Sequence, residues 1–130
     1  MQPAAFDPLD FLRLADVLAA DDADEAALRT AIGRAYYAVY LLARPKTTVQ
    51  GRRSAHERVR VAISPTNHRL ASLIGNMSKH RDVADYEPVP VNPQFRNWRR
   101  NRELVRRNAA DALAELSTLP DLDPDQDESP

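Results

Sequence analysis

Residues 79–86, KHRDVADY, place a guanidinium where a helical pattern predicts an apolar side chain. The preceding Leu70, Ile74 and Met77 are spaced four and three residues apart, which is the spacing of one buried helical face. The next position in this spacing is Arg81. A charged group on a buried face is costly unless it is paired or binds an anion. Arg81 is therefore the first candidate for chemistry in this chain.

The residues after Arg81 allow two interpretations of its charge. Arg81 and Asp85 are four residues apart and can pair on one helical face, while Asp82 and Tyr86 form a second such pair that is rotated from the first. In the structural interpretation, the ion pair stabilises the helix and Tyr86 closes its end. In the functional interpretation, Asp85 holds Arg81 toward a groove in which the guanidinium binds an anion or takes part in catalysis. The sequence leaves both open.

A second candidate set lies in GRAYYAVY, residues 33–40. Tyr36 and Tyr40 are four residues apart, and Arg34 and Tyr37 are three apart, so each pair shares a helical face. Tyrosines at this spacing are typical of a core with hydroxyls at its edge. The alternative is that one hydroxyl, with Arg34 and Tyr37, faces the same groove as Arg81.

Histidine and cysteine usage excludes several classes of site. The chain has no cysteine, and its three histidines lie far apart, so the sequence predicts no metal site. It contains no glycine-rich phosphate loop and no GxSxG motif. His56, in RRSAHERV, is typical of a surface histidine. It could supply an imidazole to Arg81 only if the fold brings the two together.

The strongest basic cluster is FRNWRRNRELVRR, residues 95–107. Helical spacing predicts that four arginines share one face opposite Trp98, namely Arg96, Arg99, Arg100 and Arg107. This face could track the phosphates of RNA. It could equally be a solvated face whose arginine stems cover apolar surface.

Charge is unevenly distributed along the 130 residues, although the net charge is only −1. Residues 1–28 hold seven acids and one arginine, residues 29–120 hold 17 bases and seven acids, and residues 121–130 hold five acids and no base. The basic middle could attract an anionic partner, or the acidic ends could simply neutralise it. The start of the chain lacks the pattern of a secretory signal, and no apolar run is long enough to span a membrane, so we expect a cytoplasmic protein.

The elements that must position these residues are all predicted to be helical. Helical apolar spacing, potential caps and proline breaks predict an all-α fold, an antiparallel bundle of about five helices with bounds near 7–20, 24–44, 54–63, 67–86 and 94–116. Ser54 and Glu57 have the spacing of a capping box at the start of the third helix. We expect a single helical domain over residues 1–118 and a disordered acidic tail over 119–130.

Three segments together resemble the HEPN family, in particular its small stand-alone bacterial members. They are GRAYYAVYLLAR in a long helix, SAHERV at the start of a short helix and RDVADY before a proline-containing loop, and the resemblance covers about residues 25–118. It implies an all-α homodimer with a groove at the dimer interface. Family members include metal-independent RNases that act as toxins or defence effectors, several of them paired with a nucleotidyltransferase antitoxin. Others are non-catalytic and bind nucleotides, RNA or proteins.

The active RNases of the family carry an arginine followed after four to six residues by a histidine, and no histidine in this chain has an arginine at that interval. Arg81 has Tyr86 at the matching position, and a phenol is a poor general base near neutral pH. We therefore expect a HEPN-like homodimer of a toxin–antitoxin or defence system, without a cofactor and without an intact RNase motif. From the resemblance and the spacings together, the expected catalytic residues are Arg81, Tyr86 and His56. The residues expected to bind a nucleotide or RNA are Arg34, Tyr37, Arg81, Asp85, Arg96, Arg99 and Arg100.

The alternative function comes from a different class. The chain could be a non-catalytic helical interaction subunit that partners a nucleotidyltransferase or another effector, and the Arg81–Asp85 pair would then be structural.

Overall fold

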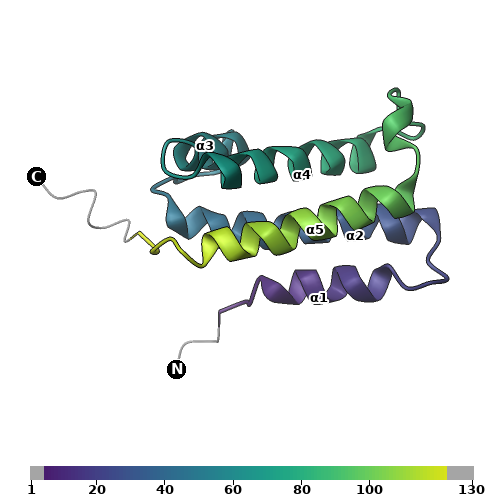
Figure 1. The fold of residues 1–130 in the computed structure, drawn as a ribbon, viewed down its shortest axis with the longest axis horizontal. Helices are drawn as coiled ribbons and strands as arrows, with labels where there is room; N and C mark the ends of the chain where they lie inside the picture. The colour runs from purple at the N-terminus through teal and green to yellow at the C-terminus, as the bar shows by residue number, and fades with distance from the viewer. Residues whose placement is uncertain (1–4, 123–130) are drawn as a thin grey trace, which may run out of the picture.

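The computed structural model describes residues 5–122, and every regular element in that range is a helix. The α-helices are α1 (Leu9–Leu18), α2 (Glu25–Ala43), α3 (Ala55–Ile63), α4 (His68–Tyr86) and α5 (Trp98–Leu116) (Figure 1). Two short 3-10 helices, η1 (Arg44–Lys46) and η2 (Pro93–Phe95), lie in the connections. The predicted all-α fold of five helices is confirmed.

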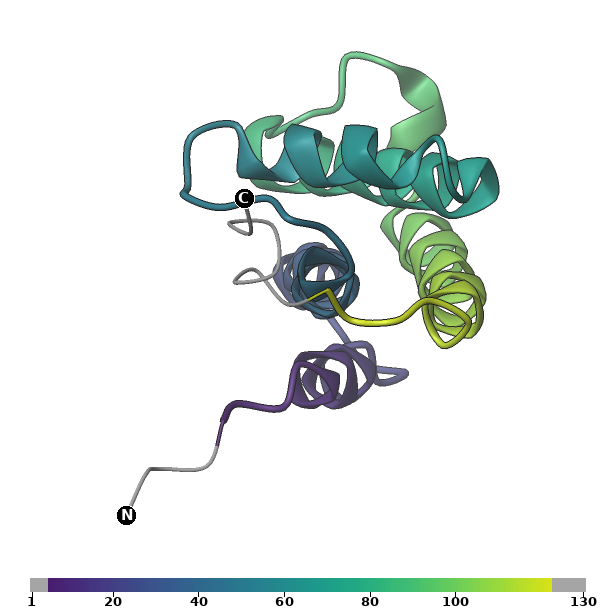
Figure 2. The ribbon, with the colours of Figure 1, turned by 90° about the vertical axis from the view of Figure 1, so that its left-hand side faces the viewer.

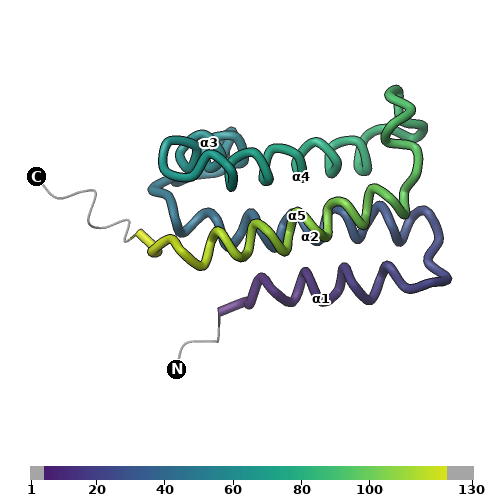
Figure 3. The backbone as a smooth tube through the Cα atoms, viewed as in Figure 1, coloured from purple at the N-terminus to yellow at the C-terminus, as the bar shows by residue number. Residues whose placement is uncertain are grey.

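Four of the helices run alternately in opposite directions along one axis. The chain reverses between α1 and α2, and again between α4 and α5 (Figure 3). Viewed from the end, α2 lies at the centre, with α1 on one side and α4 lying across both α2 and α5 on the other (Figure 2). The short α3 runs across one end of α4 (Figures 1 and 2). In this arrangement α4 packs against α2 and α5 along its length and contacts α3 at one end.

Side-chain caps fix where three of the helices begin. Asp24, Asn67 and Asn97 accept hydrogen bonds from the backbone N–H groups of Ala27, Leu70 and Arg100, at 2.8, 3.0 and 3.0 Å. Such caps satisfy donors that have no partner within the helix. The first two confirm the predicted starts of α2 and α4.

The predicted start of the last helix at residue 94 is wrong by four residues. Pro93 begins a single turn of 3-10 helix, and Asn97 then caps a separate α-helix that starts at Trp98. The side chain of Asn92 accepts a hydrogen bond from Gln94 N–H and caps the 3-10 turn in its own right. Two successive caps therefore divide what the arginine pattern predicts as one continuous helix.

The predicted capping box at Ser54 does not form. Ser54 has a φ of 54°, in the left-handed region, and its side chain makes no capping hydrogen bond. Glu57 pairs with Arg60 instead of reaching back to Ser54. Gly51 also has a positive φ, 76°, which glycine adopts without strain. The loop therefore turns twice in the left-handed region before α3 begins.

The core lies where α2, α4 and α5 meet. Ile32 and Val39 of α2, Met77 of α4 and Val105 of α5 are fully buried. The apolar seam of α5 lies in this core, because Trp98, Val105, Ala109, Ala112 and Leu116 are all buried. The guanidinium of Arg29 stacks on the Trp98 ring at 4.1 Å, and it also donates to the backbone oxygens of Ala84 and Pro88. Arg29 thus links α2 to the ends of α4 and α5.

The chain after α5 returns to η1. Leu122 N–H donates to the Pro45 oxygen at 2.8 Å, and Lys46 Nζ pairs with Asp121 at 2.8 Å. The first four residues of the predicted tail, 119–122, therefore lie against the bundle, and its remaining residues, 123–130, lie outside the described part of the chain. Within residues 5–122, no helix combines the length and apolar character needed to cross a bilayer.

Candidate functional site

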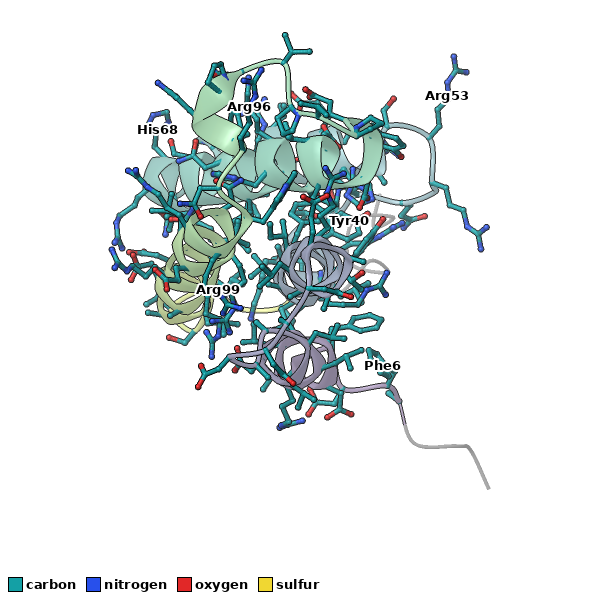
Figure 4. All side chains as sticks on the ribbon, turned by 90° about the vertical axis from the view of Figure 1, so that its right-hand side faces the viewer. Phe6, Tyr40, Arg53, His68, Arg96 and Arg99 are labelled. Carbon is teal, nitrogen blue, oxygen red and sulfur yellow. The ribbon has the colours of Figure 1, made fainter. Side chains whose placement is uncertain are left out.

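Side chains from three helices meet around His56, although they are far apart in the sequence. We call this set the three-helix cluster: Tyr36, Tyr37 and Tyr40 of α2, His56 of α3, and Arg81 and Asp82 of α4. Tyr40 lies between α2 and the layer formed by α3 and α4 (Figure 4). The cluster brings together two predicted catalytic residues, His56 and Arg81, and the predicted binding residue Tyr37.

Arg81 is held mainly by residues of its own chain. Its Nη1 donates to the Tyr37 hydroxyl at 3.1 Å and lies 3.7 Å from Asp85, while Nη2 bonds Asp82 at 2.8 Å. The guanidinium carbon lies 5.2 and 5.5 Å from the ring centroids of Tyr36 and Tyr37. The predicted Asp85 pair is present, but Asp82 is the closer carboxylate. The aromatic and acidic contacts compensate for a side chain that is only 14% exposed.

His56 is fixed by stacking and by one hydrogen bond. Its ring stacks on Tyr40 with 3.9 Å between centroids and 14° between planes. Its Nδ1 lies 2.6 Å from the Tyr36 hydroxyl. Among residues 5–122, its Nε2 has no hydrogen-bond partner, and it is not one of the atoms sealed from solvent. One ring nitrogen is therefore held by the protein, and the other is available to a ligand.

The surroundings keep the imidazole neutral near pH 7. Burial and the positive charge of Arg81 lower the pKa of His56, with Arg44 adding to this effect and Asp82 opposing it. Burial raises the pKa of Tyr36 to about 12, so its phenol keeps its proton. When Tyr36 donates to Nδ1, Nε2 carries the ring hydrogen. In the opposite tautomer, Nδ1–H donates to the Tyr36 oxygen, and Nε2 can accept a proton.

Arg44 closes the end of the cluster beside the loop before α3. It donates from Nη1 to the Tyr40 hydroxyl at 3.1 Å and from Nη2 to the Gly51 oxygen at 2.6 Å. Sequence reasoning missed Arg44. The signal was the spacing of Tyr36, Tyr40 and Arg44, which repeats every four residues and places all three on one face of α2.

A groove of about 390 Å³ opens between α2 and α4, next to the cluster. It is lined by Gly33, Arg34, Tyr37 and Asp85, among others. A Cβ at Gly33 would lie 3.9 Å from the Asp85 carboxylate, which is an ordinary van der Waals contact, so the groove tolerates a small side chain there. Three predicted binding residues, Arg34, Tyr37 and Asp85, therefore line one groove. The Arg34 guanidinium lies over the rings of Phe11 and Tyr37, at 5.1 and 5.4 Å from their centroids.

Tyr86 lies apart from this arrangement. It is 72% exposed at the last residue of α4, and five residues of helix turn it about 140° away from Arg81. The interval between Arg81 and Tyr86 therefore does not bring the two side chains together. His56, which comes from a different helix, occupies the position beside the guanidinium.

The arginines that were predicted to share one face of the last helix lie in different surroundings. Arg96 precedes α5, and its Nε donates to the Pro90 oxygen at 2.9 Å. Arg99 donates to the backbone oxygens of Ala20 and Asp21 after α1, each at 3.3 Å. The side chains of Arg96 and Arg99 consequently lie on different sides of the bundle (Figure 4). Arg100 lines a separate hollow between α4 and α5.

Two further arginines of α5 serve as structural contacts. Arg102 and Arg106 each bond the Asp16 carboxylate of α1 at 2.8 Å. The basic cluster of α5 is thus used partly to hold α1, which explains how a helix with only two fully buried residues docks on the bundle. The α5 arginines do not form a single basic surface.

No group of three or more metal-binding side chains is present within residues 5–122. The chemistry available at the three-helix cluster is that of a neutral imidazole next to a guanidinium. The guanidinium can bind an oxyanion, and the imidazole can exchange a proton with a group bound there.

Comparison with known proteins identifies no relative for this chain: no protein-family model, no curated protein and no solved structure matches it.

Proposed function

We propose that this chain is a HEPN-like protein that binds a phosphate group of RNA or of a nucleotide at the three-helix cluster. The observation that supports this proposal is that His56 and Arg81, which are 25 positions apart and belong to different helices, both pack on the rings of Tyr36 and Tyr37. A neutral imidazole with a free Nε2 beside a guanidinium is a suitable arrangement for a phosphodiester.

The existing contacts of Arg81 suggest how the phosphate enters. Asp82 holds Nη2, but its side chain is 55% exposed and can turn into solvent. A phosphate oxygen then replaces the carboxylate oxygen on Nη2, while Tyr37 continues to hold Nη1. Arg34, in the neighbouring groove, supplies a second positive charge for the next phosphate of a strand.

The same arrangement supports metal-independent RNA cleavage as the catalytic form of this function. The RNA 2′-hydroxyl attacks the adjacent phosphorus, and Nε2 of His56 accepts the hydroxyl proton. The bond to the 5′-oxygen of the next nucleotide breaks and that oxygen takes a proton from water, which leaves a 2′,3′-cyclic phosphate and a 5′-hydroxyl; the imidazolium then returns its proton to the solvent. Arg81 stabilises the negative charge that develops on the phosphate. Tyr86 has no part in this reaction, and His56 takes the role of the histidine that is missing from the Arg-x4–6-His spacing.

The wider biological role rests on the family resemblance. We propose a homodimer that acts in a toxin–antitoxin or defence system and is controlled by a nucleotidyltransferase-type antitoxin. Light scattering on the purified chain tests the dimer, and growth after expression with and without a candidate antitoxin tests the toxin. A monomeric protein whose expression leaves growth unchanged would contradict this role.

The binding proposal is tested with a fluorescein-labelled single-stranded RNA and fluorescence anisotropy. We expect Arg81→Gln to weaken binding by about tenfold, because the charged hydrogen bond to phosphate is lost. Arg69→Gln is the matched control on α4, because Arg69 pairs at the surface with Asp111 and Glu115, away from the cluster. Circular dichroism establishes that each variant is folded. Equal affinity for wild type and folded Arg81→Gln would remove the cluster from RNA binding.

Cleavage is followed separately on a gel, in the presence of a chelator. We expect His56→Gln to abolish cleavage while retaining RNA binding, because it removes the proton acceptor and leaves Arg81 in place. Cleavage by His56→Gln at the wild-type rate would exclude the catalytic form.

A second candidate function is a protein-interaction subunit, and one observation favours it. Tyr86, Val89 and Val91 are 71–83% exposed at the end of α4 and in the loop after it, and both terminal nitrogens of the Arg81 guanidinium already have partners within the chain. In this case, Arg81→Gln lowers stability without changing RNA binding, and Val91→Asp prevents association with the partner in a co-purification experiment.

A further inference from the structure

Two adjoining hollows open on the other side of α4, between α4 and α5. They share His80, Phe95 and Leu104. The smaller, about 280 Å³, is also lined by Asn76, Lys79 and Asn108. The larger, about 430 Å³, is also lined by Gln94, Arg100 and Asn101. None of these residues belongs to the three-helix cluster or to the groove between α2 and α4.

The wall between the hollows is aromatic. The rings of His80 and Phe95 meet edge to face, with 4.9 Å between centroids. Phe95 is positioned by Asn101, a buried residue whose side-chain amide donates to the Phe95 oxygen at 2.6 Å. The aromatic surface is therefore set by a buried hydrogen bond, and a planar ring can pack against it.

Amide groups surround this aromatic wall. Asn76 and Asn108 lie on one side and Gln94 on the other, and each side chain offers both a donor and an acceptor. No side-chain hydrogen bond occupies these three amides within residues 5–122. Groups of this type suit the edge of a heteroaromatic base, which carries donors and acceptors in the plane of its ring.

The hollows also carry uncompensated positive charge. Lys79 lines one and Arg100 the other, and no acid lines either. Unlike Arg81, neither Lys79 nor Arg100 pairs with any carboxylate in the described part of the chain. The ligand that fits this lining is an anion with a planar heteroaromatic ring.

His80 provides a further polar group at the point where the hollows join. Its Nδ1 is sealed from solvent and has no hydrogen-bond partner in residues 5–122. Burial lowers the pKa of His80, so the ring is neutral near pH 7 and has one donor and one acceptor nitrogen.

We propose that the space between α4 and α5 binds a nucleoside monophosphate, with the base against Phe95 and the phosphate on Arg100. The larger hollow has the size of ordinary small-ligand sites, which begin at about 300 Å³. The amides of Gln94 and Asn76 read the edge of the base, and Lys79 is the second cation available to the phosphate. This site is independent of phosphate binding at the three-helix cluster. The nucleotide can be free or can be the phosphorylated end of an RNA.

The experiment is isothermal titration of the full chain with AMP, adenosine and inorganic phosphate. We expect AMP to bind at least about tenfold more tightly than either fragment, because only AMP uses both the aromatic wall and Arg100. Arg100→Gln should weaken the binding of AMP about tenfold, because a charged hydrogen bond to the phosphate is lost. Leu104→Trp should block both hollows, since Leu104 lines both and its side chain is at the surface.

Arg107→Gln is the control, because Arg107 is exposed on the same helix and lines neither hollow. The proposal is overturned if AMP does not bind, if inorganic phosphate binds as tightly as AMP, or if AMP binds Arg100→Gln and Leu104→Trp as it binds wild type. In an Arg81→Gln background, Arg100→Gln should still weaken AMP binding by about tenfold, which separates this site from the three-helix cluster. Competition of AMP by a 5′-phosphorylated RNA, but not by its unphosphorylated form, identifies an RNA end as the ligand; no competition identifies the free nucleotide.

Discussion

His80 and Arg81 are neighbours in the sequence, but they face different sides of α4 and meet very different surroundings. Toward α2 and α3, Arg81 is bonded to Tyr37 and Asp82 and is covered by aromatic rings. Toward α5, His80 borders two hollows whose cations have no carboxylate partner within residues 5–122. The first side uses its polar groups mainly to hold three helices together. The second leaves its polar groups available, so the two sides should respond differently to substitution.

The largest difference is expected from removing Arg81. Arg81→Met leaves the Tyr37 hydroxyl and two acids without their partner, and we expect the free energy of unfolding to fall by about 2 kcal/mol. The loss is smaller than for a fully buried ion pair, because Asp82 and Asp85 are 55% and 40% exposed. Lys79→Met, on the other side of α4, should change it by less than about 0.5 kcal/mol. Urea unfolding measures both, and equal losses would contradict the contrast.

The next largest effect is expected within the first side, at Tyr36. Tyr36→Phe removes the hydroxyl that holds His56 Nδ1 at 2.6 Å, and it keeps the buried ring. We expect a loss of about 1 kcal/mol from the lost hydrogen bond. Tyr86→Phe is the matched control, because that ring is 72% exposed, and it should be neutral. A neutral Tyr36→Phe would show that the hydroxyl does not stabilise the position of His56.

Proton titration of the two histidines distinguishes the sides without unfolding the protein. Burial lowers the pKa of both, but Arg81 contributes only to the shift of His56. Arg81→Gln should therefore raise the pKa of His56 and leave that of His80 unchanged, as followed by NMR chemical shifts. Equal movement of both would mean that Arg81 acts on the two sides alike.

The same lowered pKa values set the direction of the pH dependence of stability. Between the folded pKa of each histidine and about 6.5, the unfolded chain binds more protons than the folded chain. The contribution of these two histidines to the free energy of unfolding is therefore fully present above about pH 6.5, and it decreases as the pH falls through this window. Urea midpoints across the window measure this, and His80→Asn should reduce the slope.

The smallest effect is expected at Ser54, in the loop that leads to His56. Ser54 is in the left-handed region and gains no cap from its side chain. Ser54→Gly removes the strain but increases the freedom of the unfolded chain, so we expect a net stabilisation of about 0.5 kcal/mol. Destabilisation, measured by thermal unfolding, would show that the serine side chain is needed there.

Local features of the sequence were sufficient for the helices and insufficient for the site. The helices predicted to start near residues 24 and 67 do so, and Asp24 and Asn67 cap them, because capping depends on a few adjacent residues. The capping box predicted at Ser54 does not form, because the loop imposes a left-handed backbone on that residue. The predicted start of α5 was wrong, because Pro93 begins a separate 3-10 turn and Asn97 caps the α-helix that follows.

Contacts between helices explain what the sequence could not predict. The place of Arg81 on an apolar seam predicted a largely buried guanidinium, but its closest carboxylate, Asp82, depends on how the side chain turns toward α2. His56 is typical of a surface residue in sequence, and only the packing of α3 across α4 brings it to Tyr36 and Arg81. The arginines of α5 were predicted as one face because spacing alone does not reveal that Arg99 reaches the chain after α1.

The stacking of Arg29 on Trp98 has a practical consequence. Trp98 is the only tryptophan in the chain, so all indole fluorescence comes from the point where α2, α4 and α5 meet. Its emission therefore reports the separation of these helices as a local optical signal that needs no attached dye. A red shift that precedes the loss of far-ultraviolet circular dichroism would reveal that this end of the bundle opens before the helices melt.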